Sequence, residues 1–511
     1  MKSHFLTVSI AILIGLSTSA TLSTAEHGRL PADDWHLKRV EAFIEDSPQP
    51  DYHHPSDAAI EAFRDLKFGV RIHWGVYAMI GDASWPLLHM TNEERQSYQQ
   101  KYKSFNPAGF NADEWMQLFQ TNGVQVFAFT AKHHDGFSMF DTQTRVKQRV
   151  NWTAPGGPRI EDCDLAYSIM ETPFRRDIVK ELCDAGQRFG LKIDLYYSHP
   201  DWYDADFRPY AMNPLRTEST NTYGALPDEF DAKYTKNIFV APDPTPEERE
   251  RMMARHREQL VELLTRYGRI DMLCLDQWLG SNVWPELRET IKLVRKLQPD
   301  VMLRARGIGN YGDYYTPEGW IPGSKENTTM PWMVIYKLAG TWVYQPNLTK
   351  YKGTDWVVEN LADITAKGGN FMVGIGPDDQ GRFHPQVVQT LQETGAWLKV
   401  NGTAIFESRP RSGDLWREGE HIRFTRTKDN RFIHAISLRW PGELLILKTV
   451  SAKPGSQITL LGESTPLKWR NDPRRGLMIA LPERLQNPEN RPCRFAYAFQ
   501  IEGHDRVVSA N

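Results

Sequence analysis

Short apolar runs alternate with longer amphipathic stretches over most of the chain. The strand-like segment 68–72, apolar except for Arg71, follows a stretch with helical spacing at 57–66, and the strand-like segment 191–197 follows another at 174–190. Runs of this length are typical of strands buried on both faces of a parallel sheet, and the amphipathic stretches are typical of helices that cover it. The pattern therefore predicts an α/β domain with parallel strands and right-handed crossovers.

The alternation gives a set of expected elements. Thr245 and Glu248 form a capping-box pattern with Pro246 at the first turn, so a helix should begin there. The expected strands are 68–72, 124–130, 191–197, 270–275, 300–304 and 370–375, and the expected helices are 57–66, 111–122, 174–190, 245–267, 285–298, 354–367 and 385–400.

The hydrophobic period changes near Glu407. Short strand-like segments separated by turn residues follow, and no stretch of helical length intervenes, which predicts a small C-terminal β-sandwich. These segments are 421–427, 432–438, 443–447, 457–461, 476–481 and 495–501. We therefore expect a larger α/β domain at 26–405 and an all-β domain at 406–511.

Residues 1–25 have the pattern of a secretory signal peptide. Lys2 gives a charged start, residues 5–16 are apolar, and residues 17–25 are small and polar. The apolar core is too short to span a bilayer, so we expect a cleaved signal rather than a membrane anchor. Cleavage is expected after Ala20 or Ala25, and the mature protein is expected to be secreted or periplasmic.

Composition excludes some classes of partner. The 511 residues carry a formal net charge of -3, so there is no basic field for nucleic acid. The 16 Trp, 19 Tyr and 23 Phe would suit either a sugar-binding cleft or a large core. The four cysteines have no metal-like spacing, and a bridge between Cys163 and Cys183 remains open.

One carboxylate, Asp276, comes directly after an expected strand. The apolar run 270–275 follows Tyr267-Gly268, which is a helix-ending signal, and it stops on Asp276, with Trp278 two residues later. Barrels of parallel strands keep their chemistry at the carboxyl ends of strands, where an Asp beside an aromatic ring is a candidate catalytic residue. The alternative is that Asp276 caps the next helix or satisfies a loop.

Other expected strand ends carry histidine, aromatic and charged residues. If the strands form a barrel, these side chains meet on one face, where rings could stack on a sugar and polar groups could bond its hydroxyls. There is no Gly-rich phosphate cradle, which argues against a nucleotide. The residues concerned are His73, Trp74, His133, His134, Asp135, Tyr197, His199, Asp276, Trp278 and Arg306.

The adjacent residues His133 and His134 have two further interpretations. As metal ligands they would need a third partner, and neighbours on a strand end point in two directions, so no metal site is predicted. One of the two could also be a packed core histidine.

Hydrolysis of a glycosidic bond usually needs a second carboxyl group as proton donor. Glu286 and Glu289 fall on an expected helix and should be surface residues. Glu318 lies in a Pro- and aromatic-rich segment, 313–322, where desolvation can raise a carboxyl pKa. Glu318 is therefore the first candidate and Glu326 the second, with a surface turn as the alternative for Glu318.

Together the motifs resemble the α-L-fucosidases of glycoside hydrolase family 29. Each motif is weak alone, but their order across residues 65 to 407 is specific. The segments that carry the resemblance are Phe68-Gly-Val-Arg-Ile-His-Trp-Gly, Lys132-His-His-Asp-Gly-Phe, Arg176-Asp-Ile-Val-Lys-Glu-Leu, Leu195-Tyr-Tyr-Ser, the stretch 270–278, Asn370-Phe-Met-Val-Gly-Ile-Gly-Pro-Asp and Gly395-Ala-Trp-Leu-Lys-Val-Asn-Gly-Thr-Ala-Ile-Phe.

The resemblance implies a retaining exo-α-L-fucosidase with a (β/α)8-like barrel, a C-terminal β-sandwich and no cofactor. Asp276 matches the family's nucleophile, and Glu318 matches one pattern for the acid/base because it follows Arg306 and a Thr-Pro pair. The expected substrate is a fucosylated oligosaccharide or glycan. The expected substrate-binding residues are His73, Trp85, His133, His134, Tyr197, Trp278 and Arg306.

The chain also departs from the family's pattern. Some members place the acid/base glutamate after a later tryptophan, but here Trp332 is followed by Met333. Cys274 stands where a tryptophan is often found two residues before the nucleophile. Two alternatives stay open: a glycosidase for a related sugar such as α-L-galactose, and a secreted fucose-binding protein that has lost hydrolysis.

Overall fold

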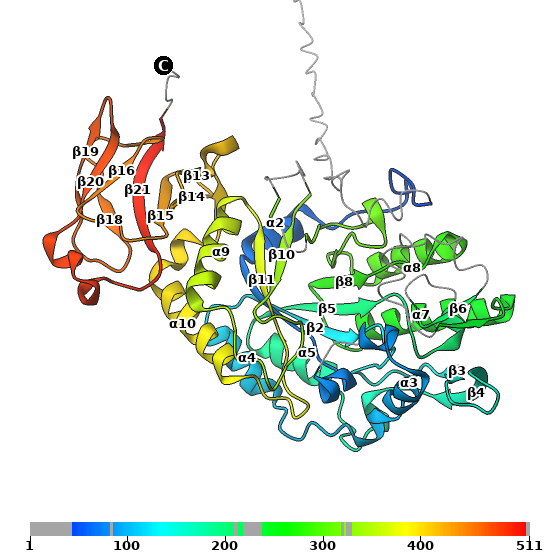
Figure 1. The fold of residues 1–511 in the computed structure, drawn as a ribbon. Coiled ribbons are helices and arrows are strands. Elements are labelled where there is room, and N and C mark those ends of the chain that lie inside the picture. Colours follow the sequence, from blue (N-terminus) through cyan, green and yellow to red (C-terminus); the bar gives the residue numbers. More distant parts are fainter. Residues whose placement is uncertain are drawn as a thin grey trace, which may run out of the picture.

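The computed structural model describes residues 43–81, 85–208, 213–217, 238–317, 321–322 and 330–506 (Figure 1). Of its two sheets with seven described strands, one is entirely parallel and has the order β10-β11-β1-β2-β5-β8-β9. These strands are β1 (Phe68–Ile72), β2 (Val126–Lys132), β5 (Lys192–Ser198), β8 (Met272–Asp276), β9 (Met302–Leu303), β10 (Met333–Lys337) and β11 (Asn370–Ile375).

The sheet curls into a half-barrel, which confirms the expected barrel-like α/β fold. Tyr314 forms an isolated parallel bridge with Arg304 beside β9, and Tyr315 forms another with Trp332 before β10. A two-residue segment thus links the two edge strands, in the place where a complete barrel would have an eighth strand.

The expected helices form at nearly the predicted positions. The capping box of Thr245 and Glu248 is present, with Pro246 as the first helical residue. The helices around the half-barrel are α2 (Asp57–Asp65), α3 (Asn92–Tyr98), α4 (Ala112–Thr121), α5 (Ile178–Arg188), α7 (Pro246–Thr265), α8 (Trp284–Leu297), α9 (Thr354–Ala366) and α10 (Pro385–Asn401).

Helix α2 covers the amino-terminal end of the half-barrel. Its Phe63, with Leu66 just beyond it, packs with Met272, Met302 and Met372 in one buried cluster. The polar residues that follow the strands lie at the opposite, carboxyl-terminal end.

The C-terminal part is all-β, as the change of period predicts. Its sheets have the orders β12-β14-β15-β21-β17, with β13 and β18 attached, and β16-β20-β19. The strands are β12 (Ser408–Pro410), β13 (Arg417–Glu418), β14 (Ile422–Thr427), β15 (Phe432–Ser437), β16 (Leu444–Leu447), β17 (Val450–Ala452), β18 (Ile458–Leu460), β19 (Lys468–Asp472), β20 (Gly476–Ala480) and β21 (Tyr497–Asp505).

This β domain packs beside α9 and α10, as Figure 1 shows in orange and yellow. The Trp397 indole in α10 donates to the backbone oxygen of Ala496 across 2.8 Å. Arg423 of β14 donates to Asp363 of α9 across 2.6 Å. The two parts are therefore joined by these two polar contacts, and Ile436 and Ala498 of the β domain belong to the same buried apolar cluster as Trp397.

All four cysteines are free, so Cys163 and Cys183 do not form a bridge. Within the described residues, each helix is too short or too polar to cross a lipid bilayer.

Candidate active site

Asp276 is the last residue of β8 and is only 5% exposed. Its carboxylate is held from both sides of the strand. The Tyr196 hydroxyl of β5 donates to Oδ2 across 2.6 Å, and the Arg306 guanidinium donates to Oδ1 across 2.8 Å. Arg304 Nη1 lies 3.4 Å from the same Oδ1. Charge-assisted bonds of this kind fix a carboxylate in one orientation.

The surroundings keep Asp276 ionised. Burial alone would raise the pKa of this carboxyl group, but the guanidinium charges of Arg306 and Arg304 and the Tyr196 hydrogen bond outweigh it. The pKa of Asp276 is therefore held well below its usual range, and the group is a carboxylate at neutral pH. An anionic, fixed oxygen is what a nucleophile or an electrostatic stabiliser requires.

Three histidines that follow β1 and β2 line the same end of the sheet. The rings of His73 and His133 lie 5.6 Å apart, the rings of His133 and His134 lie 4.4 Å apart, and His134 Nε2 is 3.7 Å from Asp276 Oδ2. Burial lowers the pKa of His73 and His133 well below the usual value and lowers that of His134 to about 4. All three are therefore neutral at neutral pH.

Neutral imidazoles can both donate and accept hydrogen bonds. The Nδ1 atoms of His73 and His134 are buried and have no hydrogen-bond partner among the described residues. Because buried polar atoms are usually paired, these two nitrogens are suited to hydroxyl groups of a bound ligand.

Aromatic side chains pack against the histidines of the site. Trp85 opens the short helix η2 (Trp85–Leu88), and its ring lies 5.7 Å from that of His134, edge to face. Trp202 lies 5.1 Å from His134, and Trp342 stacks on His73 at 5.0 Å. The sequence does not mark Trp202 or Trp342 as site residues, because both lie in loops without a periodic pattern.

The structure corrects the prediction for Tyr197. Its hydroxyl donates to Gln259 of α7 across 2.8 Å, on the outer face of the sheet. The preceding residue, Tyr196, is the one that touches Asp276. Successive side chains of a strand point to opposite faces, so a shift of one residue moves the hydroxyl from the site to the helix layer.

The other residues predicted for the site do not all lie beside Asp276. Arg306 contacts Asp276 directly, as described above, whereas Trp278 is buried in the main apolar cluster. Glu318 and Glu326, the two acid/base candidates, lie outside the described residues. Glu286 and Glu289 are exposed on α8, as expected for surface residues.

A buried ion network supports the loop behind His134. Arg255 of α7 donates to Asp201 across 2.7 Å and to Asp204 across 3.2 Å. The neighbouring Trp202 backbone N–H donates to the His134 oxygen across 2.8 Å. The network thus holds the loop that presents Trp202 to the site.

Cys274, two residues before Asp276, contacts two arginine side chains. Arg71 Nη2 lies 3.2 Å and Arg304 Nη1 lies 2.9 Å from Cys274 Sγ. The family that the motifs resemble often has a tryptophan at the position of Cys274. In this chain that position holds a small side chain whose sulfur accepts from two arginines. Arg304 is therefore shared between Cys274 and Asp276.

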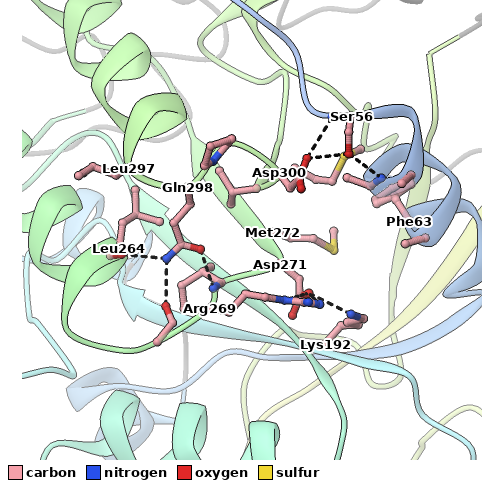
Figure 2. Close-up of a pocket in the computed structure, with 18 of the residues that line it drawn as sticks. Ser56, Phe63, Lys192, Leu264, Arg269, Asp271, Met272, Leu297, Gln298 and Asp300 are labelled. Carbon is pink, nitrogen blue, oxygen red and sulfur yellow. Dashed lines mark hydrogen bonds and ion pairs between the residues drawn. The ribbon is translucent and has the colours of Figure 1, made fainter.

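A cavity of about 660 Å³ lies at the other end of the half-barrel. Figure 2 shows residues that line it. It is lined by Phe63 and Met272, together with Arg269, Asp271 and Gln298 near the amino ends of the strands. It is therefore separate from the carboxylate site. Within the part of the chain that the structure describes, His, Cys, Asp and Glu residues form no group of three or more that could hold a metal ion.

Comparison with known families gives two matches. The model described as Alpha-L-fucosidase matches residues 45–403, and the model described as Alpha-L-fucosidase C-terminal domain matches residues 417–502. The first match covers the half-barrel with its site, and the second covers most of the β domain.

Individual proteins agree with these matches. The chain is 27% identical over 469 residues to human plasma alpha-L-fucosidase, covering 86% of this chain and 89% of that protein. It is 25% identical over 510 residues to rat tissue alpha-L-fucosidase, covering 94% and 95% respectively.

Solved structures share the fold. Alpha-L-fucosidase isoenzyme 1 from Paenibacillus thiaminolyticus superposes with a TM-score of 0.68 at 24% identity, covering 88% of this chain and 99% of that one. An alpha-L-fucosidase GH29 from Bacteroides thetaiotaomicron gives a TM-score of 0.68 at 20% identity, covering 92% and 99%.

Proposed function

Because the chain belongs to the alpha-L-fucosidase family and is a glycoside hydrolase, we propose that it releases terminal α-linked L-fucose with retention of configuration. In this proposal Asp276 is the nucleophile and Glu318 is the acid/base. The substrate is a fucosylated oligosaccharide or glycan.

The observation that carries the proposal is the state of Asp276. Its carboxylate is ionised, buried and fixed by Tyr196 and Arg306. A retaining hydrolase needs such an oxygen to attack the anomeric carbon and form a covalent glycosyl-enzyme. As the bond to the anomeric carbon forms, the Asp276 carboxylate loses its charge. The Tyr196 hydroxyl and the Arg306 guanidinium keep the attacking oxygen in one position.

The histidines and aromatic rings would hold the sugar. The unpartnered Nδ1 atoms of His73 and His134 are suited to fucose hydroxyls, and His133 lies between them. Trp85 and Trp342 provide apolar surface for the less polar face and methyl group of fucose.

Glu318 would act twice. In the first step, its protonated carboxyl donates to the leaving oxygen while Asp276 attacks. In the second step, the Glu318 carboxylate deprotonates the water that releases fucose. A separation of about 5–5.5 Å between the two carboxyl groups fits this course, and a separation above about 6.5 Å contradicts it. Glu326 is the alternative if Glu318 is dispensable.

We also infer that the protein acts outside the cytoplasm, because residues 1–25 read as a signal peptide. The mature N-terminus tests this: Edman sequencing of exported protein should begin at Thr21 or Glu26. An intact Met1 in exported protein would contradict it.

Hydrolysis of 4-nitrophenyl α-L-fucoside tests the function. The wild type should release nitrophenol, and Asp276→Ala should abolish turnover with the fold intact. Glu318→Ala should be slowed and then rescued by azide, because the small anion attacks the fucosyl-enzyme in place of water, releases the Asp276 carboxylate as fucosyl azide forms, and needs no general base. Activity of Asp276→Ala within about tenfold of wild type would contradict the assignment. Binding of fucose by an inactive wild type would instead favour a binding protein.

A further inference from the structure

A layer of polar side chains lies inside the half-barrel, next to the site. Successive side chains of a strand point to opposite faces, so the residue two positions before a site residue also points to the interior. In four places this residue is charged or a cysteine, and each is at most 3% exposed. The four residues of this polar layer are Arg71 before His73, Asp194 before Tyr196, Cys274 before Asp276 and Arg304 before Arg306. Interior layers of such barrels are usually bulky and apolar, so a charged layer at this depth is unusual.

The polar layer separates the site from an apolar cluster. Two residues earlier along the chain, Met272 precedes Cys274 and Met302 precedes Arg304. Both methionines belong to the buried cluster at the amino-terminal end of the half-barrel. Because apolar side chains close that side, the charges of the layer act mainly on the site, where Asp276 lies.

The sulfur atom of Cys274 joins the two arginines of the layer. Arg71 Nη2 donates to Sγ across 3.2 Å, and Arg304 Nη1 donates to it across 2.9 Å. Two guanidinium ions repel each other in a buried position of low dielectric constant, and a shared acceptor opposes that repulsion. The side chain of Cys274 has one rotatable bond, and β8 is paired with both β5 and β9. The sulfur therefore has a fixed position.

The two arginines act on the two oxygens of Asp276. Nη1 of Arg304, the atom that donates to the sulfur, also lies 3.4 Å from Oδ1. The guanidinium carbon of Arg71 lies 4.6 Å from the centre of the Tyr196 ring, and the Tyr196 hydroxyl donates to Oδ2 across 2.6 Å. A cation that packs on an aromatic ring attracts the ring and restricts its position. One sulfur atom thus fixes a group at each carboxylate oxygen.

Asp194 is the acidic residue of the layer. Burial raises the pKa of its carboxyl group to about 6, and the guanidinium charges of Arg71 and Arg304 oppose that rise. The group is therefore mostly ionised at neutral pH. Removal of either arginine would leave buried carboxylates with less compensation, whereas removal of the sulfur leaves these charged groups in place. Substitution of Cys274 therefore tests positioning without removing a charged side chain.

We propose that Cys274 is a positioning residue for the nucleophile, because its sulfur holds Arg304 at Oδ1 of Asp276 and Arg71 against Tyr196. This inference rests on the proposed fucosidase activity and adds a residue through which the attacking carboxylate is oriented. Cys274 acts through the two arginines and does not touch the sugar.

The test separates attack on the sugar from binding of the sugar. Cys274→Ala should lower kcat/KM for 4-nitrophenyl α-L-fucoside at least about tenfold, because the guanidinium groups lose the acceptor that orients them on Asp276. The inhibition constant of L-fucose should stay within about threefold of wild type, because the histidines and rings that would hold the sugar are unchanged. Cys274→Ser should return kcat/KM to within about threefold of wild type, because a hydroxyl oxygen accepts from the same donors.

A buried cysteine in the helix layer gives the matched control. Cys183 of α5 is free and 0% exposed, as Cys274 is. Cys183→Ala removes the same atom at an independent position and should keep kcat/KM within about twofold of wild type. If Cys274→Ala does not fold, Cys274→Thr and Cys274→Val replace it as a pair of equal shape. The Thr variant, which keeps an acceptor oxygen, should then be at least about fivefold faster than the Val variant.

A double-mutant cycle tests whether Cys274 acts through an arginine. In the variant that combines Cys274→Ala with Arg304→Gln, the loss of kcat/KM should be clearly smaller than the product of the two single losses. Losses that multiply would overturn the inference. It would also be overturned if Cys274→Ala matched the Cys183→Ala control, or if Cys274→Ser were as slow as Cys274→Ala. A wild type that does not hydrolyse the aryl fucoside would instead overturn the proposed function.

Discussion

The Tyr196 hydroxyl donates to the Oδ2 atom of Asp276 across 2.6 Å, and the two side chains come from neighbouring strands of the half-barrel. The tyrosine that touches the candidate nucleophile is thus fixed by the sheet itself rather than by a loop. Its hydrogen bond keeps the carboxylate oriented while burial excludes water.

Removing this hydroxyl should slow the reaction. A hydrogen bond to a charged group contributes about 1.5–3 kcal/mol, so Tyr196→Phe should lower kcat/KM for 4-nitrophenyl α-L-fucoside about 10- to 100-fold. Tyr197→Phe is the matched control, because its hydroxyl bonds Gln259 in the helix layer. It should stay within about threefold of wild type in rate. Equal losses in both variants would contradict the geometry.

The acid limb of activity should depend on Arg306. The guanidinium charge of Arg306 holds the pKa of Asp276 down. In Arg306→Gln that pKa should rise toward its usual value, so the fraction of carboxylate falls at a higher pH than in wild type. As the pH is lowered, kcat/KM of Arg306→Gln should therefore begin to fall at a higher pH than kcat/KM of the wild type. An unchanged acid limb would mean that Arg306 does not control the ionisation of Asp276.

The stability of the protein should fall as pH drops below 6.5, in part because of His134. Burial lowers its folded pKa to about 4, below the unfolded value of about 6.5, so the unfolded chain takes up a proton first. The contribution of His134 is complete above about pH 6.5 and is lost as pH falls toward 4. The loss is roughly 3 kcal/mol at most.

Urea unfolding at pH 7 and at pH 4.5 measures this effect. In His134→Gln, the difference in unfolding free energy between the two pH values should be smaller than in wild type. His421→Gln is the control, because its side chain is 39% exposed in the β domain. An equal difference in His134→Gln and wild type would contradict a buried, neutral His134.

The ion network behind His134 should be essential for stability. Arg255→Ala leaves the buried carboxylates of Asp201 and Asp204 without their guanidinium and should cost about 3–5 kcal/mol of unfolding free energy. The surface pair of Arg188 and Asp113 is the comparison, and Arg188→Ala should cost less than about 1 kcal/mol. Denaturant unfolding separates the two, and similar values would mean that the buried network does not stabilise the loop.

The sequence predicts β1 and β11 with the observed bounds because each is mostly apolar, with Arg71 and Asn370 as the polar exceptions. It does not predict β10, because no helix-length stretch precedes Met333 to mark another strand–helix unit. Because β10 is not predicted, the sequence does not place the loop that follows β10 at the site. Trp342, which lies in that loop, is therefore not predicted as a site residue.

Side-chain direction is the second limit. In β5, Lys192 and Asp194 share a face with Tyr196, but both faces of the strand are largely buried, so the sequence does not show which face is turned toward Asp276. Only the pairing of β5 with β8 decides which hydroxyl meets Asp276. The sequence does not predict the role of Arg304 for a similar reason, because its contact with Cys274 joins β8 to the residue that follows β9.

The most direct test of the account is to trap the covalent intermediate. The protein is treated with 2-fluoro-fucosyl fluoride, digested with a protease and analysed by tandem mass spectrometry. The account predicts one added 2-fluoro-fucosyl group, carried by Asp276 and absent in Asp276→Ala. A label on another carboxylate, or active turnover with no label on Asp276, would contradict the assignment of Asp276 as the nucleophile.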